Sequence, residues 1–306
     1  MTSGALTVRV GVSFSPFAAD GLAGGDFWSA VDALEALGYD SLWLSDTATG
    51  GGVAPLPALA AVAARTRRLK LGTGVLVLPP RNPVLLAREL ATVDAISGGR
   101  LLPAGGIGIG DGPELEALAV PRAERAARLE ESLSVIRLLW TGAPVTHRGR
   151  FWSLTDVTLA PRPVRPRLEF WLGGSAPEGL RRVGRIADGW LGAFVGPDEF
   201  AAKVELIRAA AADAGRSIDE DHFGTTLFAA PSAAQIPAAV HERLQRAPGL
   251  TAGDHIAHGA EQLRVLLTRF RAAGATKFVV VPIADQLLPW LREMYEHAVA
   301  PVEAAR

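Results

Sequence analysis

The chain of 306 residues contains no cysteine. Disulfide bonds, thiolate metal sites and cysteine nucleophiles are therefore excluded. The sequence also lacks an apolar run of the roughly 18 residues that a membrane-spanning helix needs. Its first residues do not join a basic segment to an apolar one, as a secretion signal does, so we expect a cytoplasmic protein with no membrane partner.

A surplus of charge of either sign is missing too. The sequence has 31 basic and 32 acidic residues, a formal net charge of -1, and its basic residues are scattered along the chain. Proteins that bind nucleic acid usually present a basic patch or stripe, so we expect no nucleic-acid partner. Because 49% of the residues are hydrophobic and 21% are charged, the composition predicts a large buried core and excludes general disorder.

Three common ligand-binding motifs are absent: the Walker A sequence, the G-x-S-x-G elbow and the G-x-G-x-x-G turn of dinucleotide-binding sheets. Residues 105–112 are rich in glycine, but not at the G-x-G-x-x-G spacing. An open doubly wound sheet, the main alternative α/β fold, usually carries that turn after its first strand. Its absence favours a barrel.

Strand-like and helix-like segments alternate along nearly the whole chain. The expected strands lie at residues 8–17, 41–46, 69–78, 101–110, 170–174, 190–194, 223–230 and 277–283. Between them apolar residues recur with the three- and four-residue spacing of amphipathic helices, as in 126–140. This repetition predicts a (β/α)8 TIM barrel, and since single barrels of about 250 residues or more are common, we expect one domain over residues 1–306.

Residues 141–168 interrupt the alternation between the fourth and fifth expected strands. The segment contains prolines at positions 144, 161, 163 and 166 and shows no helical period. It predicts an insertion loop with a short hairpin.

The turn after the fifth expected strand is Gly173-Gly174-Ser175. Two glycines let the backbone turn tightly and approach a ligand, Ser175 can cap the following helix, and the first N–H groups of that helix favour an anion. The same residues also suit the geometry of any strand-to-helix turn. Since barrels bind ligands at the C-terminal ends of their strands, the turn is a candidate phosphate site.

Several short motifs follow one another in a fixed order: LGYDSLWLSD at 37–46, TRRLKLGTGV at 66–75, SGGR at 97–100, GRF at 149–151, PRP at 161–163, WLGGS at 171–175 and ADGW at 187–190. In this order they resemble the bacterial-luciferase-like flavin and coenzyme F420 oxidoreductases over nearly the whole chain. The resemblance implies a barrel that holds FMN, or alternatively F420, and acts on a small organic molecule.

The resemblance also implies which residues hold the cofactor. Its phosphate is expected in the loop after the fifth strand, which here is Gly173, Gly174, Ser175 and Ala176. Its ring is expected on a bulge of the third strand that often contains a non-proline cis peptide, which here is Thr73, Gly74 and Val75. The glycine-rich end of the fourth strand is expected beside it, at Gly106 and Gly108.

Two carboxylates are candidates for catalysis. Asp46 resembles a family aspartate that lies near the cofactor ring, although an aspartate at a strand end can also simply bind a loop backbone. Asp111 follows the fourth-strand glycines where some F420-dependent relatives have a catalytic acid, and the alternative is an exposed turn residue. Thr47 replaces the histidine that many members carry after the aspartate, so histidine chemistry is absent there. We expect Phe14, Thr47 and Phe194 on the substrate side.

The resemblance predicts a monooxygenase that uses reduced FMN and oxygen, with a flavin reductase partner or NAD(P)H as the source of electrons. Direct hydride transfer by F420 is the alternative. A barrel that binds flavin without catalysis is a third interpretation, which the threonine at position 47 favours. We also expect a homodimer or a higher homo-oligomer.

Metal and imine chemistry have weaker support in the sequence. Among the histidines, His255 and His258 form the one cluster, beside Asp254, in a polar segment typical of a solvated loop, so we expect no metal. Lys70 and Lys277 lie at the beginnings of expected strands. An aldolase-type lysine would stand at the opposite end of a barrel strand.

Overall fold

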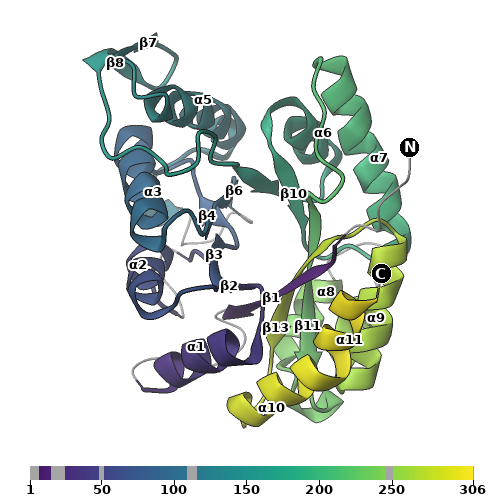
Figure 1. Cartoon of the computed structure of the whole chain (residues 1–306). Helices are drawn as coiled ribbons and strands as arrows, with labels where there is room; N and C mark the ends of the chain where they lie inside the picture. Colours follow the sequence, from purple (N-terminus) through teal and green to yellow (C-terminus); the bar gives the residue numbers. More distant parts are fainter. Residues whose placement is uncertain (1–6, 15–24, 48–51, 109–115, 246–250, 306) are drawn as a thin grey trace.

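The computed structural model describes residues 7–14, 25–47, 52–108, 116–245 and 251–305. In this part of the chain parallel strands form a barrel, and helices pack on its outside (Figure 1). The barrel strands, two of which are bent into halves, are β1 (Arg9–Phe14), β2 (Ser41–Leu44), β3 and β4 (Lys70–Thr73 and Leu76–Val77), β5 and β6 (Leu101–Leu102 and Ala104–Gly106), β9 (Trp171–Gly173), β10 (Gly189–Gly192), β11 (Phe223–Ala230) and β13 (Lys277–Pro282).

The barrel closes through the two bent strands. β3 pairs with β5, where Leu71 faces Leu101, and after the bend β4 pairs with β6, where Leu76 faces Gly105. The hydrogen-bonded path therefore begins and ends on the same two chain segments, and the barrel strands described leave no open edge. The TIM barrel expected from the sequence is confirmed, with the third and fourth expected strands each divided by a bend.

Helices follow the barrel strands where the sequence predicts them. They are α1 (Gly25–Leu37), α2 (Pro55–Arg65), α3 (Pro83–Ser97), α5 (Arg122–Trp140), α6 (Pro177–Ile186), α7 (Pro197–Asp213), α9 (Ala260–Ala272) and α10 (Leu287–Met294), which continues through the π-turn η3 (Tyr295–Val299) into α11 (Ala300–Ala304). The bounds of α3 show why: Asn82 Oδ1 accepts a hydrogen bond from Val84 N at 2.9 Å, Pro83 is the first helical residue, and Gly98 ends the helix with φ 67°.

The insertion between β6 and β9 contains the expected hairpin. Strands β7 (Val145–Arg148) and β8 (Ser153–Val157) pair antiparallel. Glu131 of α5 accepts hydrogen bonds from Phe151 N at 3.0 Å and from Trp152 N at 2.8 Å. The hairpin is therefore attached to the helix that precedes it.

The segment after β11 has more structure than the sequence predicts. It contains the short 3-10 turns η1 (Ala233–Gln235) and η2 (Ala252–Asp254), the helix α8 (Ala238–Gln245) and the strand β12 (Ile256–His258). β12 pairs parallel with the C-terminal half of β11, where Phe228 faces Ile256. The sheet is therefore extended by one short strand beside the C-terminal half of β11.

Side chains fill the inside of the barrel. The buried inward-facing cluster consists of Trp43, Ala104, Trp171, Leu191 and Val279. Gly72 makes room for one of the two tryptophans, because a Cβ atom at this position would lie 2.1 Å from Trp43 Cδ2. The alternate residues of each strand point outward and pack against the helices in one continuous core.

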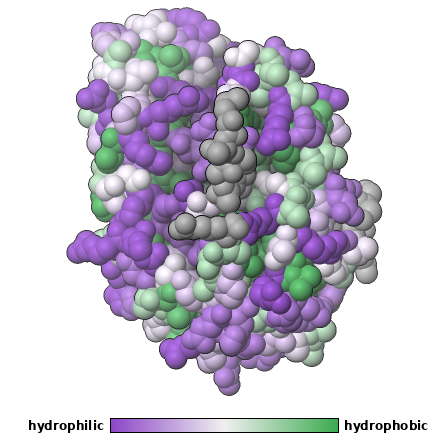
Figure 2. Space-filling view, turned by 45° about the vertical axis from the view of Figure 1, so that its right-hand side comes forward, coloured by the Kyte–Doolittle hydropathy of each residue, from purple (hydrophilic) through white to green (hydrophobic). Residues whose placement is uncertain are grey.

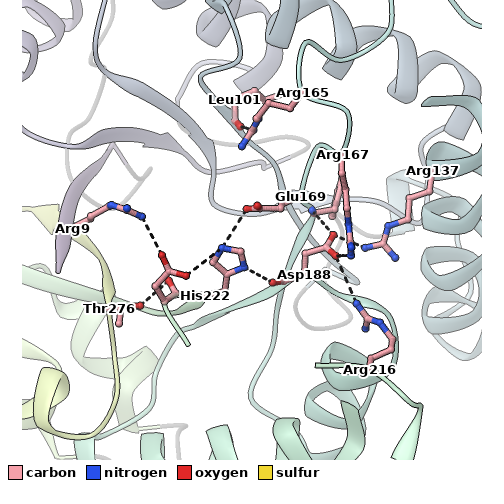
Figure 3. A network of polar contacts seen from close by, with 12 residues as sticks. Arg9, Leu101, Arg137, Arg165, Arg167, Glu169, Asp188, Arg216, His222 and Thr276 are labelled. Carbon is pink, nitrogen blue, oxygen red and sulfur yellow. Dashed lines mark hydrogen bonds and ion pairs between the residues drawn. The ribbon is translucent and has the colours of Figure 1, made fainter. Parts of the chain in front are cut away.

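At the N-terminal ends of the strands, Asp188 holds several elements together (Figure 3). Its carboxylate, 4% exposed, accepts hydrogen bonds from Phe170 N at 2.9 Å and from Arg137 Nη2 at 2.7 Å, and it pairs with Arg167 and Arg216. Burial alone would raise the pKa of Asp188, but Arg137, the Phe170 amide and Arg167 outweigh burial and hold it below its usual range. The aspartate of the ADGW motif is thus a structural residue.

Lys277, Asp40 and Lys70 form a second polar cluster at the same end of the barrel. Lys277 Nζ donates to Asp40, and Lys70 Nζ lies 2.9 Å from Asp40 Oδ1. Burial lowers the pKa of Lys277 to about 8, although Asp40 acts in the opposite direction. Both lysines stand at strand beginnings, as expected, and not at the end where barrels bind ligands.

Hydrophilic side chains cover most of the face in Figure 2, and the hydrophobic ones visible on it form small separate groups. This is the usual surface of a protein whose apolar residues fill the interior. Among the described residues, none of the helices has the length and apolar character that crossing a membrane requires.

Candidate functional site

The C-terminal ends of three barrel strands meet around the side chain of Val75. A Cβ atom on Gly106 would lie 3.0 Å from Val75 Cγ2, and one on Gly173 would lie 3.3 Å from Val75 Cγ1. Both glycines therefore keep bare backbone against this valine, where a larger residue would have to push it aside. The structure thus brings together expected cofactor residues from β6, β9 and the bend between β3 and β4.

The bend between β3 and β4 contains a cis peptide bond between Gly74 and Val75. Gly74 N donates to Leu44 O at 2.9 Å, and the Gly74 carbonyl accepts a hydrogen bond from Ser45 Oγ at 3.2 Å. The bend is therefore attached to the end of β2. It has the form of the bulge that the resemblance implies as the support of a cofactor ring.

Thr73 uses its side chain inside the fold. The buried hydroxyl donates to Ala104 O and accepts from Ala104 N, both at 2.8 Å. It joins β3 to β6 at the bend, where the strand ladder is interrupted. Only the backbone of Thr73 is left to border the bulge, so we expect no side-chain contact from this residue to a cofactor.

The loop after β9 has the open shape expected of a phosphate site. Gly174 has φ +119°, and a Cβ atom there would have nothing within 4 Å. Its carbonyl accepts a hydrogen bond from Trp190 Nε1 at 2.8 Å, so β10 fixes the position of the loop. A glycine is needed here for backbone conformation, since space is not limiting.

The expectation that Ser175 caps the following helix is wrong. Ala176 is the N-cap residue of α6, with φ −72° and ψ 147°, and no side chain makes a cap hydrogen bond. Pro177 follows as the first helical residue, so the first helical N–H groups belong to Glu178 and Gly179. An anion at this helix end would meet backbone groups, and Ser175 would contribute from the loop.

Lys203 is a candidate site residue that sequence reasoning missed. It lies on α7, and its Nζ donates to Ser175 O at 3.3 Å while pairing with Glu199 at 3.7 Å. It brings a positive charge to the phosphate loop from 28 positions along the chain. The four-residue spacing between Glu199 and Lys203 on a helix is typical of an ordinary surface pair, so the sequence alone does not indicate the contact with the loop after β9.

Asp46 is buried at the end of β2 and already has partners. Its Oδ2 accepts hydrogen bonds from Val77 N at 2.9 Å and from Arg81 Nη2 at 2.8 Å. The side chain is 8% exposed and that of Arg81 34%. The carboxylate thus ties β2 to β4 across the bulge, and Arg81, unnoticed in the sequence, is its main partner.

The three residues expected on the substrate side have different positions. Phe14 packs edge-on against Phe27 of α1, with ring centroids 6.1 Å apart, so it belongs to the layer between barrel and helices and does not face the barrel axis. Thr47 is partly buried next to Asp46. Phe194 follows β10, is partly buried, and has φ 56°.

Two further expectations concern the end of the fourth strand and metals. Gly108 has φ 82° and is the last residue described before a gap. Asp111 lies outside the described residues, so its catalytic role stays a prediction. Within the described ranges, no group of three or more histidine, aspartate or glutamate side chains could hold a metal ion.

These residues fit a phosphorylated ring cofactor. Because Gly106 and Gly173 have no side chains, their backbone forms a wall directly beside Val75. A Cβ atom at either position would crowd this valine. The loop at Gly174 is open, and it leads into a helix N-terminus with Lys203 beside it. Backbone N–H groups with a nearby cation suit a phosphate.

The fold is a (β/α)8 barrel, and we call the C-terminal ends of its strands the rim. The candidate ligand site on this rim is the bulged third strand beside the glycine turn after β9. The chain belongs to the luciferase-like monooxygenase family, which it matches over residues 12–282. The family resemblance of the sequence motifs is thereby confirmed.

Similar curated proteins cover only part of the chain. It is 40% identical over 171 residues to an F420-dependent glucose-6-phosphate dehydrogenase from Nakamurella multipartita, an alignment covering 52% of this chain and 49% of that protein. A protein of the same name from Microbacterium testaceum is 37% identical over 169 residues, or 51% of this chain and 49% of that protein. The chain thus spans about half the length of these relatives.

Solved structures share the fold over nearly the whole chain. An F420-dependent secondary alcohol dehydrogenase in complex with an F420–acetone adduct matches with TM-score 0.81 and 18% identity, covering 97% of this chain and 99% of that one. The monooxygenase RslO1 from Streptomyces bottropensis matches with TM-score 0.77 and 23% identity, covering 96% and 99%. The oxygenating constituent of 3,6-diketocamphane monooxygenase from Pseudomonas putida, in complex with FMN, matches with TM-score 0.77 and 17% identity, covering 96% and 99%.

Proposed function

We propose that this protein is an oxidoreductase that binds coenzyme F420 at the rim around Val75 and exchanges a hydride with a small organic substrate. The observation that carries the proposal is the wall formed by Gly106 and Gly173 against Val75, next to the open loop at Gly174. The 40% identity to an F420-dependent enzyme over half the chain supports F420 as the cofactor, in place of the FMN first expected from the sequence.

The chain's own residues would bind and orient the cofactor. The loop of Gly173, Gly174, Ser175 and Ala176 holds the phosphate through backbone N–H groups, and Lys203 adds a positive charge. The bulge at Gly74 and Val75 supports the ring. When bound, the cofactor supplies the hydride chemistry.

We assign Asp46 a positioning role. Its Oδ2 accepts hydrogen bonds from Val77 N and from the Arg81 guanidinium, so it holds the start of β4 and therefore the bulge. This differs from the catalytic role near the cofactor ring that the resemblance implied for Asp46. Asp111 stays the candidate for an acid or base.

A monooxygenase that uses reduced FMN and oxygen is the second candidate. The similarity in fold to an FMN-bound oxygenating enzyme supports it, since FMN also carries a phosphate that the same loop could hold. A flavin reductase or NAD(P)H would then supply electrons. The homo-oligomer expected from the sequence stays a prediction for either candidate.

Binding titrations test the proposal. The purified chain is mixed with F420 and, separately, with FMN, and the quenching of tryptophan fluorescence gives each dissociation constant. We expect F420 to bind more tightly than FMN, and a protein that binds neither would contradict both candidates. A tighter FMN complex together with oxygen consumption would favour the second.

A pair of glycine variants locates the cofactor. Gly173→Val places a branched side chain against Val75 and should abolish binding. Gly253→Val is the control, because a Cβ atom there has nothing within 4 Å. Equal affinities of the two variants would show that the cofactor binds elsewhere.

A further inference from the structure

The imidazole of His255 is buried without a hydrogen-bond partner among the described residues. Its side chain is 0% exposed, and neither Nδ1 nor Nε2 makes a hydrogen bond of normal geometry. Burial lowers the pKa of His255 to about 4, although the charge of Asp254 and a weaker polar contact with the Val195 backbone act in the opposite direction. The ring is therefore neutral at pH 7, with one nitrogen a donor and the other an acceptor. Buried polar groups in native proteins are rarely unpaired, so this imidazole is a candidate for ligand binding.

Two phenylalanine rings pack against His255. Its ring stacks on Phe194 with centroids 5.3 Å apart and meets Phe228 at 5.6 Å and an angle of 64°. Phe228 belongs to a buried hydrophobic cluster against which Phe194 packs, and its other members are Ala230, Ile236, Val240, Leu244, Ile256, Val281 and Ile283. We call these side chains, with the two phenylalanines and the histidine, the His255 cluster; apart from the neutral histidine, its described members are hydrocarbon side chains.

The His255 cluster lies at the ligand-binding end of the barrel. Val281 follows Val279 by two positions on β13, so both point toward the barrel axis, and Val279 belongs to the packed interior. Phe228 points inward for the same reason, because its neighbours Leu227 and Ala229 belong to the outer core. The cluster therefore borders the rim above the interior, on the β11 and β13 side.

Phe194 covers the imidazole from the rim. It is partly buried, while His255 is fully buried, and the two rings are stacked. With φ 56°, Phe194 has a left-handed backbone conformation that is strained for a bulky residue. Such conformations concentrate at ligand-binding positions, where the surrounding structure maintains them.

We propose that the His255 cluster binds the substrate, and that this substrate is an uncharged, largely apolar molecule with one carbonyl or hydroxyl oxygen hydrogen-bonded to His255. The N–H nitrogen can donate to a carbonyl, and the other nitrogen can accept from a hydroxyl. One neutral imidazole thus serves both redox forms of the same oxygen group. The choice of a carbonyl or hydroxyl as the group that His255 binds rests on the proposed function.

A sugar phosphate does not fit this cluster. A phosphate placed against these hydrocarbon side chains would lose its water without gaining a cation from the described cluster. The charged neighbour Asp254 is itself negative and pairs with Arg269 at 3.0 Å. The substrate of this protein therefore differs from that named for its glucose-6-phosphate dehydrogenase relatives.

The test compares two ligands and two histidine variants. Titration calorimetry on the cofactor-free full chain measures binding of 2-heptanone and of glucose 6-phosphate. His255→Leu removes both ring nitrogens but keeps apolar bulk, His297→Leu makes the same change at an exposed position, and His255→Asn retains a donor and an acceptor. Circular dichroism verifies that each variant is folded.

We expect 2-heptanone to bind the wild type more tightly than glucose 6-phosphate. Its affinity should fall at least about tenfold in His255→Leu, recover in part in His255→Asn and stay unchanged in His297→Leu. Equal ketone affinity of the wild type and His255→Leu, absence of ketone binding, or tighter binding of glucose 6-phosphate would each overturn the inference. Cofactor binding is measured in a separate titration. Ketone binding that depends on His255, together with no cofactor binding, would contradict the proposed function and leave this inference standing.

Discussion

The indole N–H of Trp190 donates to the carbonyl oxygen of Gly174 at 2.8 Å. The ring of Trp190 is itself held by stacking on Phe200, with centroids 5.0 Å apart. Strand β10 thus determines where the loop after β9 lies. The tryptophan of the ADGW motif therefore supports the glycine turn of the WLGGS motif.

Replacing Trp190 with phenylalanine should weaken cofactor binding. The variant keeps an aromatic ring against Phe200 but loses the donor to Gly174. We expect the free energy of unfolding to fall by about 1 kcal/mol and the dissociation constant of F420 or FMN to rise several-fold. Urea unfolding and fluorescence titration measure the two effects.

Trp140→Phe is the matched control for this variant. Trp140 Nε1 donates to Ala87 O at 3.0 Å, between α5 and α3 and away from the phosphate loop. The Trp140→Phe variant should show a similar decrease in the free energy of unfolding and no change in cofactor affinity. If both variants lose affinity equally, the hydrogen bond to Gly174 has no special role.

The two glycines of the turn should respond differently to alanine. In Gly173→Ala the new methyl group would lie 3.3 Å from Val75, so we expect weaker cofactor binding. In Gly174→Ala there is open space, but φ +119° is strained for alanine, so the main effect should be a loss of about 1–3 kcal/mol in stability. Titration and urea unfolding on both variants distinguish crowding from backbone strain, and the reverse pattern would refute the assignment.

His255 should make the stability of the protein depend on pH below neutrality. Its pKa falls from 6.5 in the unfolded chain to about 4 in the folded one, so the unfolded state binds the proton more readily. The stabilisation is complete above about pH 6.5 and is lost as the pH falls toward 4, amounting to about 3 kcal/mol in total.

The difference between wild type and His255→Leu isolates this effect from other acid-sensitive groups. Urea unfolding at pH 7 and pH 5 should show a larger loss of stability in the wild type than in the variant. Parallel losses in both proteins would mean that His255 is not buried in neutral form.

Asp188→Asn should destabilise the fold without changing cofactor affinity. The carboxylate holds Arg137, Arg167 and the amide of Phe170 at the strand beginnings, on the face opposite the candidate site. We expect a loss of about 1.5–3 kcal/mol at pH 7, since three partly exposed arginine side chains lose the charged acceptor that they share. Because its folded pKa is lowered, the stabilisation is present above the unfolded value and lost in strong acid.

Asp32→Asn serves as the comparison for Asp188→Asn. Asp32 pairs with Arg65 at 2.6 Å, but the two side chains are 53% and 47% exposed. Such surface pairs contribute about 0–1 kcal/mol. A large stability loss in Asp32→Asn, or weaker cofactor binding in Asp188→Asn, would contradict this assignment. The assignment gives the N-terminal ends of the strands a role in stability and their C-terminal ends the role in cofactor binding.

The barrel could be predicted because its elements carry strong local patterns. Apolar periodicity defines α7, and proline and glycine mark the two ends of α3. The strand β12 could not be predicted, because three residues carry too little pattern and their pairing depends on β11. Tertiary contact decides such short elements.

The candidate site could be predicted in its backbone but not in its side-chain partners. Glycine turns are visible in a sequence, so the bend at Gly74 and the turn after β9 were predicted, while the binding of a phosphate by that turn stays a prediction. Arg81 and Lys203 were missed because their partners lie 35 and 28 positions away. The direction of Phe14 was mistaken because a strand pattern alone does not say which of its two faces meets the helices.

Trp43 fills the middle of the barrel, and glycine on two strands lets the indole fit: a Cβ atom on Gly11 would lie 2.8 Å from its Nε1, and one on Gly72 even closer. An interior packed to this density gives a molecule no passage along the barrel axis. In the proposed function, reactant and product would therefore both pass through the C-terminal end of the barrel. Product that has not yet left would delay the entry of the next reactant.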